Sequence, residues 1–364
     1  MSSLTAGLLL LAVPLDIGRL APEVNPGARA SGAHATAWLR PRTPVRVPAS
    51  APAVRVRRGP IESRDEFLLA QARLTLPAVA PDAPPRGRTR VRVAGDWGND
   101  FGFRQGLVAG VRRLLYFVDG EHRSGSLQVS RGVTDRWTMH ARLPVLWRGG
   151  GVLDGFIDAW HRLTGLPDSN RPDFARDQLS VRALDHTRNQ VRWTARQGAG
   201  LGGLELGARW CSPSQASGWT GAVDGRVQLP TGTAGFGGGG VQLGAQAVAA
   251  RTLGAAADLY LGAGGTAASQ SEQDDISYAA VRPHGFVALE WRPWRPVSVI
   301  AEATAAGRLV RNVDGFPALH LMLRVGTKVD VRRGWRVEAG FTEGLRPIAA
   351  TTDFGLMVGL EKTF

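Results

Sequence analysis

The stretch LHLMLRVGTKVD, residues 319–330, alternates between two kinds of side chain along its whole length. One face carries Leu319, Leu321, Leu323, Val325, Thr327 and Val329. The other carries His320, Met322, Arg324, Gly326, Lys328 and Asp330. A period of two is typical of a β-strand with one apolar and one polar face. We therefore predict a strand of twelve residues here.

The same period recurs from residue 90 to the C-terminus. It appears in residues 91–97, 127–131, 137–143, 179–183, 191–196, 204–210, 223–229, 241–249, 257–263, 287–292, 297–305 and 335–342. Almost no segment after residue 172 shows a helical period. This pattern predicts an all-β protein.

The polar faces of these strands carry charges of both signs, while the apolar faces consist of Leu, Val and Ala with Trp near strand ends. Strands of about 9 to 11 residues with one apolar and one polar face are typical of a transmembrane β-barrel. We predict a closed antiparallel barrel of about 12 to 16 strands, best guess 14, because closure leaves no unpaired edge. Short turns are expected at Asp119-Gly120, Arg333-Gly334 and residues 293–296.

The charged faces would then line the lumen. The residues predicted to do so are Arg192, Arg196, Glu205, Arg209, Asp224, Arg226, Glu290, Arg292, Glu302, Arg324, Arg336 and Glu338. When all charged residues on the predicted polar faces are counted, including Arg182, which is not in this list, there are 12 basic and 8 acidic residues. An open lumen with this excess would favour anions, whereas dense pairing would plug it.

The C-terminus supports the barrel. Phe354, Leu356, Val358 and Leu360 alternate towards the final Phe364, which resembles the last-strand signal that bacterial outer-membrane proteins present to their assembly machinery. Lys362 interrupts the alternation. Aromatic residues make up only 7% of the chain, which is low for a barrel with aromatic girdles.

Composition excludes several classes of protein. The formal charge is +13, but all basic residues except Lys328 and Lys362 are arginine, and nearly half of the excess lies in the first 60 residues, so no nucleic-acid partner is expected. Cys211 is the only cysteine, which excludes an internal disulfide and a zinc ribbon. No apolar run approaches the roughly 20 residues of a membrane helix.

The N-terminal region differs from the rest. Residues 6–15 form an apolar run of signal-peptide length, with Ala-x-Ala sites at residues 28–30 and 35–37. Residues 40–60 mix Pro, Ala and Arg without periodicity. We expect residues 1–58 to hold a signal segment and a disordered linker, and residues 59–364 to form one barrel domain in the bacterial outer membrane, in contact with its lipid.

One segment has helical spacing. In residues 149–171, GGGVLDGFIDAWHRLTGLPDSNR, Val152, Phe156, Trp160 and Leu163 recur on one side. Asp154, Asp158 and His161 line up on the other, where they could hold a divalent cation or orient the imidazole as a base. Acidic residues near a helix start and a surface Asp–His pair are also ordinary. No metal or cofactor is predicted. If this segment plugs the lumen, its aspartates should pair with inward arginines.

A family resemblance rests on several stretches of this chain. They are Gly59-Pro60-Ile61, Arg64-Asp65-Glu66-Phe67, Asp96-Trp97-Gly98-Asn99, Asp119-Gly120-Glu121, Leu143-Pro144 and residues 149–171. Together they resemble the bacterial proteins grouped as domain of unknown function family 3187. The resemblance implies an outer-membrane barrel and carries no activity, cofactor or catalytic residue.

Three functions remain open from the sequence. The first is a channel or a structural or binding barrel, with a small solute or anion as its ligand. The second is a barrel enzyme acting on membrane lipid, with Asp154, Asp158 and His161 as candidates. The third is a soluble periplasmic β-protein.

Overall fold

The computed structural model describes residues 57–165, 171–185, 190–193, 195–213, 218–345 and 350–364. Residues Arg55–Phe364 form one compact unit. The expected signal segment and nearly all of the expected linker lie outside the described residues. In the described part of the chain, no helix is both long enough and apolar enough to cross a membrane.

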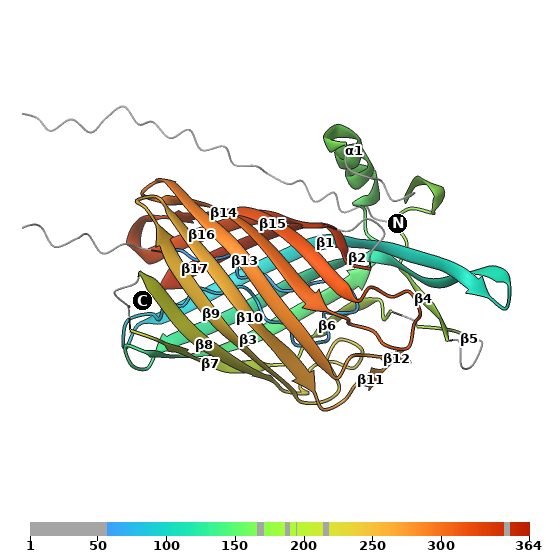
Figure 1. Ribbon diagram of the computed structural model, residues 1–364, viewed down its shortest axis with the longest axis horizontal. Helices are drawn as coiled ribbons and strands as arrows, with labels where there is room; N and C mark the ends of the chain where they lie inside the picture. The colour runs from blue at the N-terminus through green and yellow to red at the C-terminus, as the bar shows by residue number, and fades with distance from the viewer. Residues whose placement is uncertain (1–56, 166–170, 186–189, 194, 214–217, 346–349) are drawn as a thin grey trace, which may run out of the picture. The chain divides into compact units, whose positions relative to one another are not determined.

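Twelve described strands close into one antiparallel barrel (Figure 1). They are β1 (Thr89–Val108), β2 (Val111–Gly132), β3 (Trp137–Gly149), β7 (Glu205–Cys211), β8 (Trp219–Gln228), β9 (Gln242–Leu253), β10 (Ala257–Ala268), β13 (Val281–Trp294), β14 (Val297–Gly307), β15 (Leu319–Asp330), β16 (Trp335–Gly344) and β17 (Thr352–Thr363). Closure comes from pairing of β1 with both β2 and β17. The predicted barrel is confirmed, with a strand number at the low end of the expected range.

The other elements lie at the ends of the barrel, most of them at the end that carries the longer connections. Outside the ring, β4 (Ser180–Asp185) pairs with β2 and with β5 (Gln190–Arg192). The short strand β6 (Gly198–Leu201) pairs with β3 next to β7 and continues that strand in the wall. A two-stranded hairpin, β11 (Glu272–Gln273) and β12 (Ile276–Ser277), lies between β10 and β13. The predicted helix is α1 (Asp154–Thr164), and 3-10 turns span Arg171–Asp173 and Arg332–Gly334.

The two ends of the barrel differ in their connections. At one end the strands are joined by short turns, including the predicted ones at Arg333-Gly334 and between β13 and β14. The other end carries the longer connections and α1. The predicted turn at Asp119-Gly120 is wrong: both residues lie inside β2, opposite Phe101 and Asp100 of β1. The continuous ladder with β1 outweighs the local turn preference of the dipeptide.

Apolar side chains cover the outside of the wall. Exposed examples are Val93, Leu127, Val129, Leu143, Val145, Leu206, Val223, Leu243, Leu261, Val287, Leu289, Val337, Leu356, Val358 and Leu360. Exposed tryptophans lie at the short-turn end, namely Trp137, Trp291, Trp294 and Trp335. There Lys362 places its ammonium 5.2 Å from the centre of the Trp335 ring. A belt of aliphatic side chains bounded by tryptophan is the surface expected of a wall in contact with lipid.

The lumen is occupied by the chain itself. Residues 58–81, the luminal segment, precede β1 and are buried almost throughout. Arg64 pairs with Glu205 on β7, and its carbonyl accepts a hydrogen bond from Arg324 on β15. Strands β7 and β15 are six apart in a ring of twelve, so Arg64 lies between opposite walls. Figure 1 shows this N-terminal part of the unit in blue.

The apolar outer surface of the wall gives a first prediction. Val287 is 44% exposed and lies in the middle of β13. Because a charged side chain at mid-membrane must lose its hydration, Val287→Arg should destabilise the protein folded in lipid vesicles by about 2–4 kcal/mol. Urea unfolding in vesicles measures this. Leu107→Arg near the tip of the β1–β2 hairpin, where Leu107 is 76% exposed, is the control and should change little. Equal effects at both positions would contradict the lipid-facing assignment.

Candidate functional site

Ten of the twelve predicted lumen-lining residues lie on barrel strands and point inward, most of them in pairs. Arg209 and Arg226 pair with Asp224 at 3.0 and 2.8 Å, and Arg324 pairs with Glu302 at 2.9 Å. The rest of the inward pairs include Arg292 with Glu290, Arg336 with Asp330 and Arg92 with Glu338. Opposite charges on one strand or on strands close together in the ring thus neutralise each other on the inner face of the wall.

Two arginines of that predicted set do not line the lumen. Arg196 is exposed in the connection between β5 and β6, where it donates to the carbonyl of Ala234 at 2.8 Å. Arg192 belongs to β5, outside the ring, and its side chain is not among those described. Arg182 on β4 is likewise exposed. The short alternating runs of β4 and β5 belong to strands that extend the edge of β2. Nine basic residues then face eight acidic ones, so the expected excess of four positive charges falls to one.

The middle of the luminal segment is held by a cluster of charges. Glu205 is 1% exposed and accepts from Arg64 of the luminal segment and from Arg142 of β3 at 3.0 Å. Arg226 lies 4.0 Å from its second oxygen. Arg64 lies on the limb of the luminal segment before its apex, the outgoing limb, and Arg73 and Thr75 lie on the limb after it, the returning limb. Arg64 donates to the carbonyls of Thr75 and Arg73 and so joins the two limbs. Wall and segment therefore share one buried ionic network.

Near the short-turn end, the wall binds the main chain of the outgoing limb. The amides of Gly59 and Ile61 donate to Glu290 and Glu302, each at 3.1 Å. Lys328 donates to the carbonyls of Arg58 and Pro60. A segment without secondary structure must satisfy its buried backbone groups elsewhere, and here inward side chains of the barrel do so.

The returning limb is held in the same way. Leu74 donates its amide to Gln242 on β9 at 2.8 Å, and Gln246 donates to the carbonyl of Pro77 at 2.9 Å. Arg209 donates to the carbonyl of Ala80 at 3.1 Å. A small cavity remains beside this limb, lined by Asp65, Leu76, Arg282, His284, His320 and Arg324 among others. The luminal segment therefore fills most of the barrel cross-section.

At its apex the luminal segment changes character. Phe67, Leu68, Leu69 and Ala70 are buried in the largest apolar cluster of the protein. The other members come from the long connections and the strand ends near them: Tyr116, Val118, Val181, Ala183, Trp193, Ile276, Tyr278, Leu309, Val310, Val313, Phe316 and Ala350. This apolar cap closes the lumen at the long-connection end, and burial of that many apolar side chains is strongly favourable.

Sequence reasoning missed the luminal segment as a unit. Residues 40–60 were expected to be a linker and residues from 59 onward to belong to the barrel domain. The available signal was the resemblance stretch Arg64-Asp65-Glu66-Phe67, which lies just ahead of the apex and joins the wall through Asp65–Arg282 at 2.8 Å and Arg64–Glu205.

The helix α1 packs against the outer face of the barrel. Leu153 and Ile157 contact Phe354 of β17, which lies on the same face as the exposed Leu356. Glu121, on the outer face of β2, accepts from the backbone amides of Val152 and Leu153 and so holds the residues just before the helix against the wall. The sequence left open whether residues 149–171 plug the lumen or lie outside the barrel; α1 lies outside, and residues 58–81 occupy the lumen.

The most buried side of the helix is not its predicted apolar side. Asp154, Ile157, Asp158 and His161 are buried, whereas Val152, Phe156 and Leu163 are at least half exposed. The rings of Phe156 and Trp160 still contact Phe354 of β17. The outer wall here is polar, because Asn99 and Glu121 lie opposite each other on β1 and β2. The polar side of the helix packs here because its side chains find hydrogen-bond partners on this polar patch of an otherwise apolar wall.

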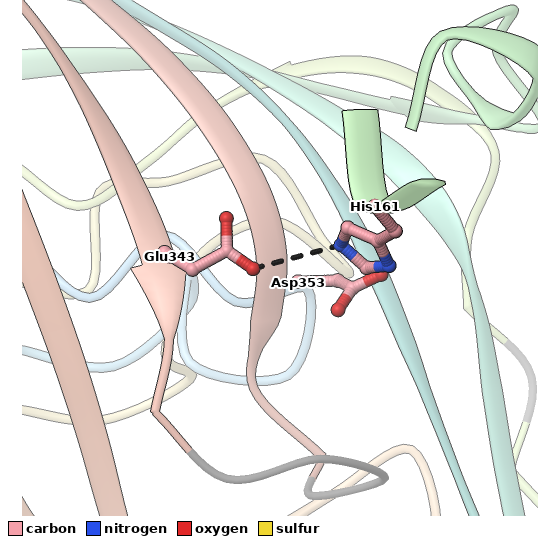
Figure 2. A group of neighbouring side chains, drawn as sticks. All are labelled: His161, Glu343 and Asp353. Atoms are coloured by element: carbon pink, nitrogen blue, oxygen red, sulfur yellow. Dashed lines mark ion pairs between the residues drawn. The ribbon is translucent and has the colours of Figure 1, made fainter. Parts of the chain in front are cut away.

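The three candidate residues of α1 do not share one site. Asp154 contacts Arg171 at 2.5 Å and Asn99 at 2.9 Å. Asp158 pairs with Arg176 at 2.5 Å. His161 faces Glu343 of β16, with 3.6 Å between Nε2 and the carboxylate (Figure 2). The Glu343 carboxylate holds the pKa of His161 above its usual range, against the opposing effect of burial.

Three of the six stretches behind the family resemblance meet where α1 contacts the wall. Trp97 donates its indole N–H to Glu121 at 2.8 Å, and Asn99 donates to Asp154. Arg171 joins Asp154 to Asp353 of β17 at 3.0 Å. Three stretches widely separated in the sequence therefore build one buried polar network that fixes the helix to the wall.

Comparison with known proteins agrees with this fold. The structure is similar to that of the COG4313 outer membrane channel from Pseudomonas putida F1, with 12% sequence identity, a TM-score of 0.53 and coverage of 78% of this chain and 97% of that chain. The NanC porin follows with 6% identity, a TM-score of 0.43 and coverage of 75% and 98%. No curated protein matches the chain. Residues 42–364 match the family described as "Protein of unknown function (DUF3187)", and the chain belongs to that family.

Proposed function

We propose that this protein is a channel of the bacterial outer membrane that is closed by its own luminal segment and opens when that segment moves. The observation that carries the proposal is the chemistry of the contact. Between the apex and the short-turn end, the luminal segment is joined to the wall by ion pairs and by hydrogen bonds to its backbone. Charged groups regain hydration when they separate, so such a contact opposes opening less than an apolar core of the same area.

The outer surface of the wall supports the proposed location in the outer membrane. The aliphatic belt and the tryptophans at the short-turn end fit a bilayer. The exposed side chains of Leu356, Val358, Leu360 and Phe364 fit the proposed assembly signal, while Phe354 lies under α1.

The charged side chains on the inner face of the wall indicate which class of solute could pass. When the luminal segment is displaced, the passage is lined by nearly equal numbers of basic and acidic side chains. We therefore propose small polar solutes, because the near balance of charge leaves little of the excess of positive charge that would favour anions in an open lumen.

A tether between segment and wall tests the proposal. Ile61 of the luminal segment packs against Ile300 of β14, so Ile61→Cys with Ile300→Cys in a Cys211→Ser background can be oxidised to a disulfide. In planar bilayers the reduced double variant should show opening events, and the oxidised one should show none. The reason is that a tethered segment cannot leave the lumen.

The Cys211→Ser protein alone is the control, and oxidant should not change its conductance. Mass spectrometry establishes that the disulfide has formed. Equal conductance of the oxidised and reduced double variants would disprove a movable segment. Absence of any conductance in the untethered protein at every voltage would disprove the channel.

A further inference from the structure

A group of metal-ligating side chains lies between α1 and the outer wall. His161 comes from α1, Glu343 from the end of β16 and Asp353 from the start of β17 (Figure 2). One ligand atom of each lies within 4.8 Å of the others. Three ligands from three different elements at this spacing can surround a single cation.

Two buried polar atoms of this group have no hydrogen-bond partner among the described residues. His161 is 3% exposed, and among the described residues its Nε2 has no hydrogen-bond partner. The nearest carboxylate oxygen of Glu343 lies 3.6 Å away, beyond hydrogen-bond distance, and the second oxygen of Glu343 also lacks a partner in the described part of the chain. Buried polar atoms are normally paired, so these atoms point to a ligand between them.

The local charge also calls for a cation. Glu343, Asp353 and Asp154 bring three carboxylates together, and Arg171 contributes one guanidinium that both aspartates share. With a neutral imidazole, the group has a formal charge of −2. Asp158 and Arg176, on the neighbouring turn, form a neutral pair of their own. A divalent cation would balance the group.

We propose that His161, Glu343 and Asp353 bind one divalent transition-metal ion of the zinc class and that the ion fastens α1 to the barrel wall. An imidazole nitrogen with two carboxylates suits such an ion, with water completing four-fold coordination. Calcium and magnesium prefer ligand sets made of oxygen alone. The site joins the long connection after β3 to β16 and β17, the last two strands of the chain.

Zinc binding to the full-length protein in detergent tests the site. After chelation and buffer exchange, the protein should take up Zn²⁺ in a titration against a fluorescent zinc indicator. His161→Ala and Glu343→Gln should each weaken the tightest binding event by about 100-fold or more, because loss of a direct ligand exceeds the 10–100-fold effect of losing an outer partner. Heat-modifiable migration in gels shows that each variant retains the folded barrel.

A second readout follows the helix itself. Arg162 is exposed on α1, next to His161, and provides a trypsin site. Zn²⁺ should slow cleavage at Arg162 in the natural protein and have no effect in His161→Ala, because a bound ion adds a further link between the helix and the wall only where its ligands are present.

Asp158→Asn is the matched control. It removes a carboxylate from the same buried face of α1, one turn before His161, and should leave zinc affinity within about twofold. Three results would overturn the proposal: no Zn²⁺ uptake, equal uptake by the natural protein and His161→Ala, or Ca²⁺ binding as tightly as Zn²⁺ at the same residues.

Discussion

Replacing Glu205 by glutamine is expected to loosen the luminal segment and to destabilise the protein by about 3–5 kcal/mol. The substitution keeps the size of the side chain but removes the charge shared by Arg64, Arg142 and Arg226. In the described part of the chain, the three buried guanidinium groups would then keep two carboxylates among their ion-pair partners: Asp224, which pairs with Arg226, and Glu66, which lies 3.9 Å from Arg142. Urea unfolding in vesicles measures the free energy, and openings in planar bilayers should become more frequent.

A double-variant cycle separates this effect from a general loss of stability. Arg64→Gln combined with Glu205→Gln should be less destabilised than the sum of the single variants, because removal of the arginine relieves part of the repulsion. Glu272→Gln, on the exposed β11, is the surface control and should change stability by less than about 0.5 kcal/mol. Strict additivity of the two buried substitutions would contradict the shared network.

Replacing Phe67 by alanine should cost about 3–5 kcal/mol as well, through packing instead of charge. Phe67 is fully buried at the apex of the luminal segment, within the apolar cap. Truncation leaves a cavity that the cap, built from several long connections, fills only in part. Trypsin cleavage of the luminal segment should accelerate, because the apex no longer holds it at the long-connection end.

Leu163→Ala provides the comparison for this variant. Leu163 is 81% exposed on α1, so its truncation should change the unfolding free energy by less than about 0.5 kcal/mol. If Phe67→Ala were equally mild, the apolar cap would not be what closes that end of the lumen.

Alternation predicted the wall because each wall strand has the same two environments along its length. In β15, His320, Met322, Arg324 and Lys328 are buried as the pattern requires. Alternation alone does not give the number of strands in the ring, because β4 and β5 alternate like wall strands while extending the edge of β2 outside the ring. Alternation shows that a segment pairs in a sheet but does not show which strand it pairs with.

The luminal segment could not be recognised from periodicity. Its side chains face wall residues on all sides, so Ile61, Phe67 and Leu74 follow no fixed spacing. The orientation of α1 has a related cause. A helical pattern distinguishes a polar side from an apolar one, whereas the neighbour that each side meets depends on residues such as Asn99 and Glu121 in distant strands. For the same reason His161 was a candidate while Glu343 and Asp353 were not.

The sequence by itself determined the barrel wall, its lipid-facing surface and the charged character of its interior, because strand periodicity is local and is written directly in the order of residues. The tertiary structure alone decided that residues 58–81 fill the lumen, that α1 lies outside, and that His161 meets Glu343 and Asp353. These features depend on contacts between residues far apart in the chain. Such contacts exist only once the ring of strands has closed and fixed which side chains face one another.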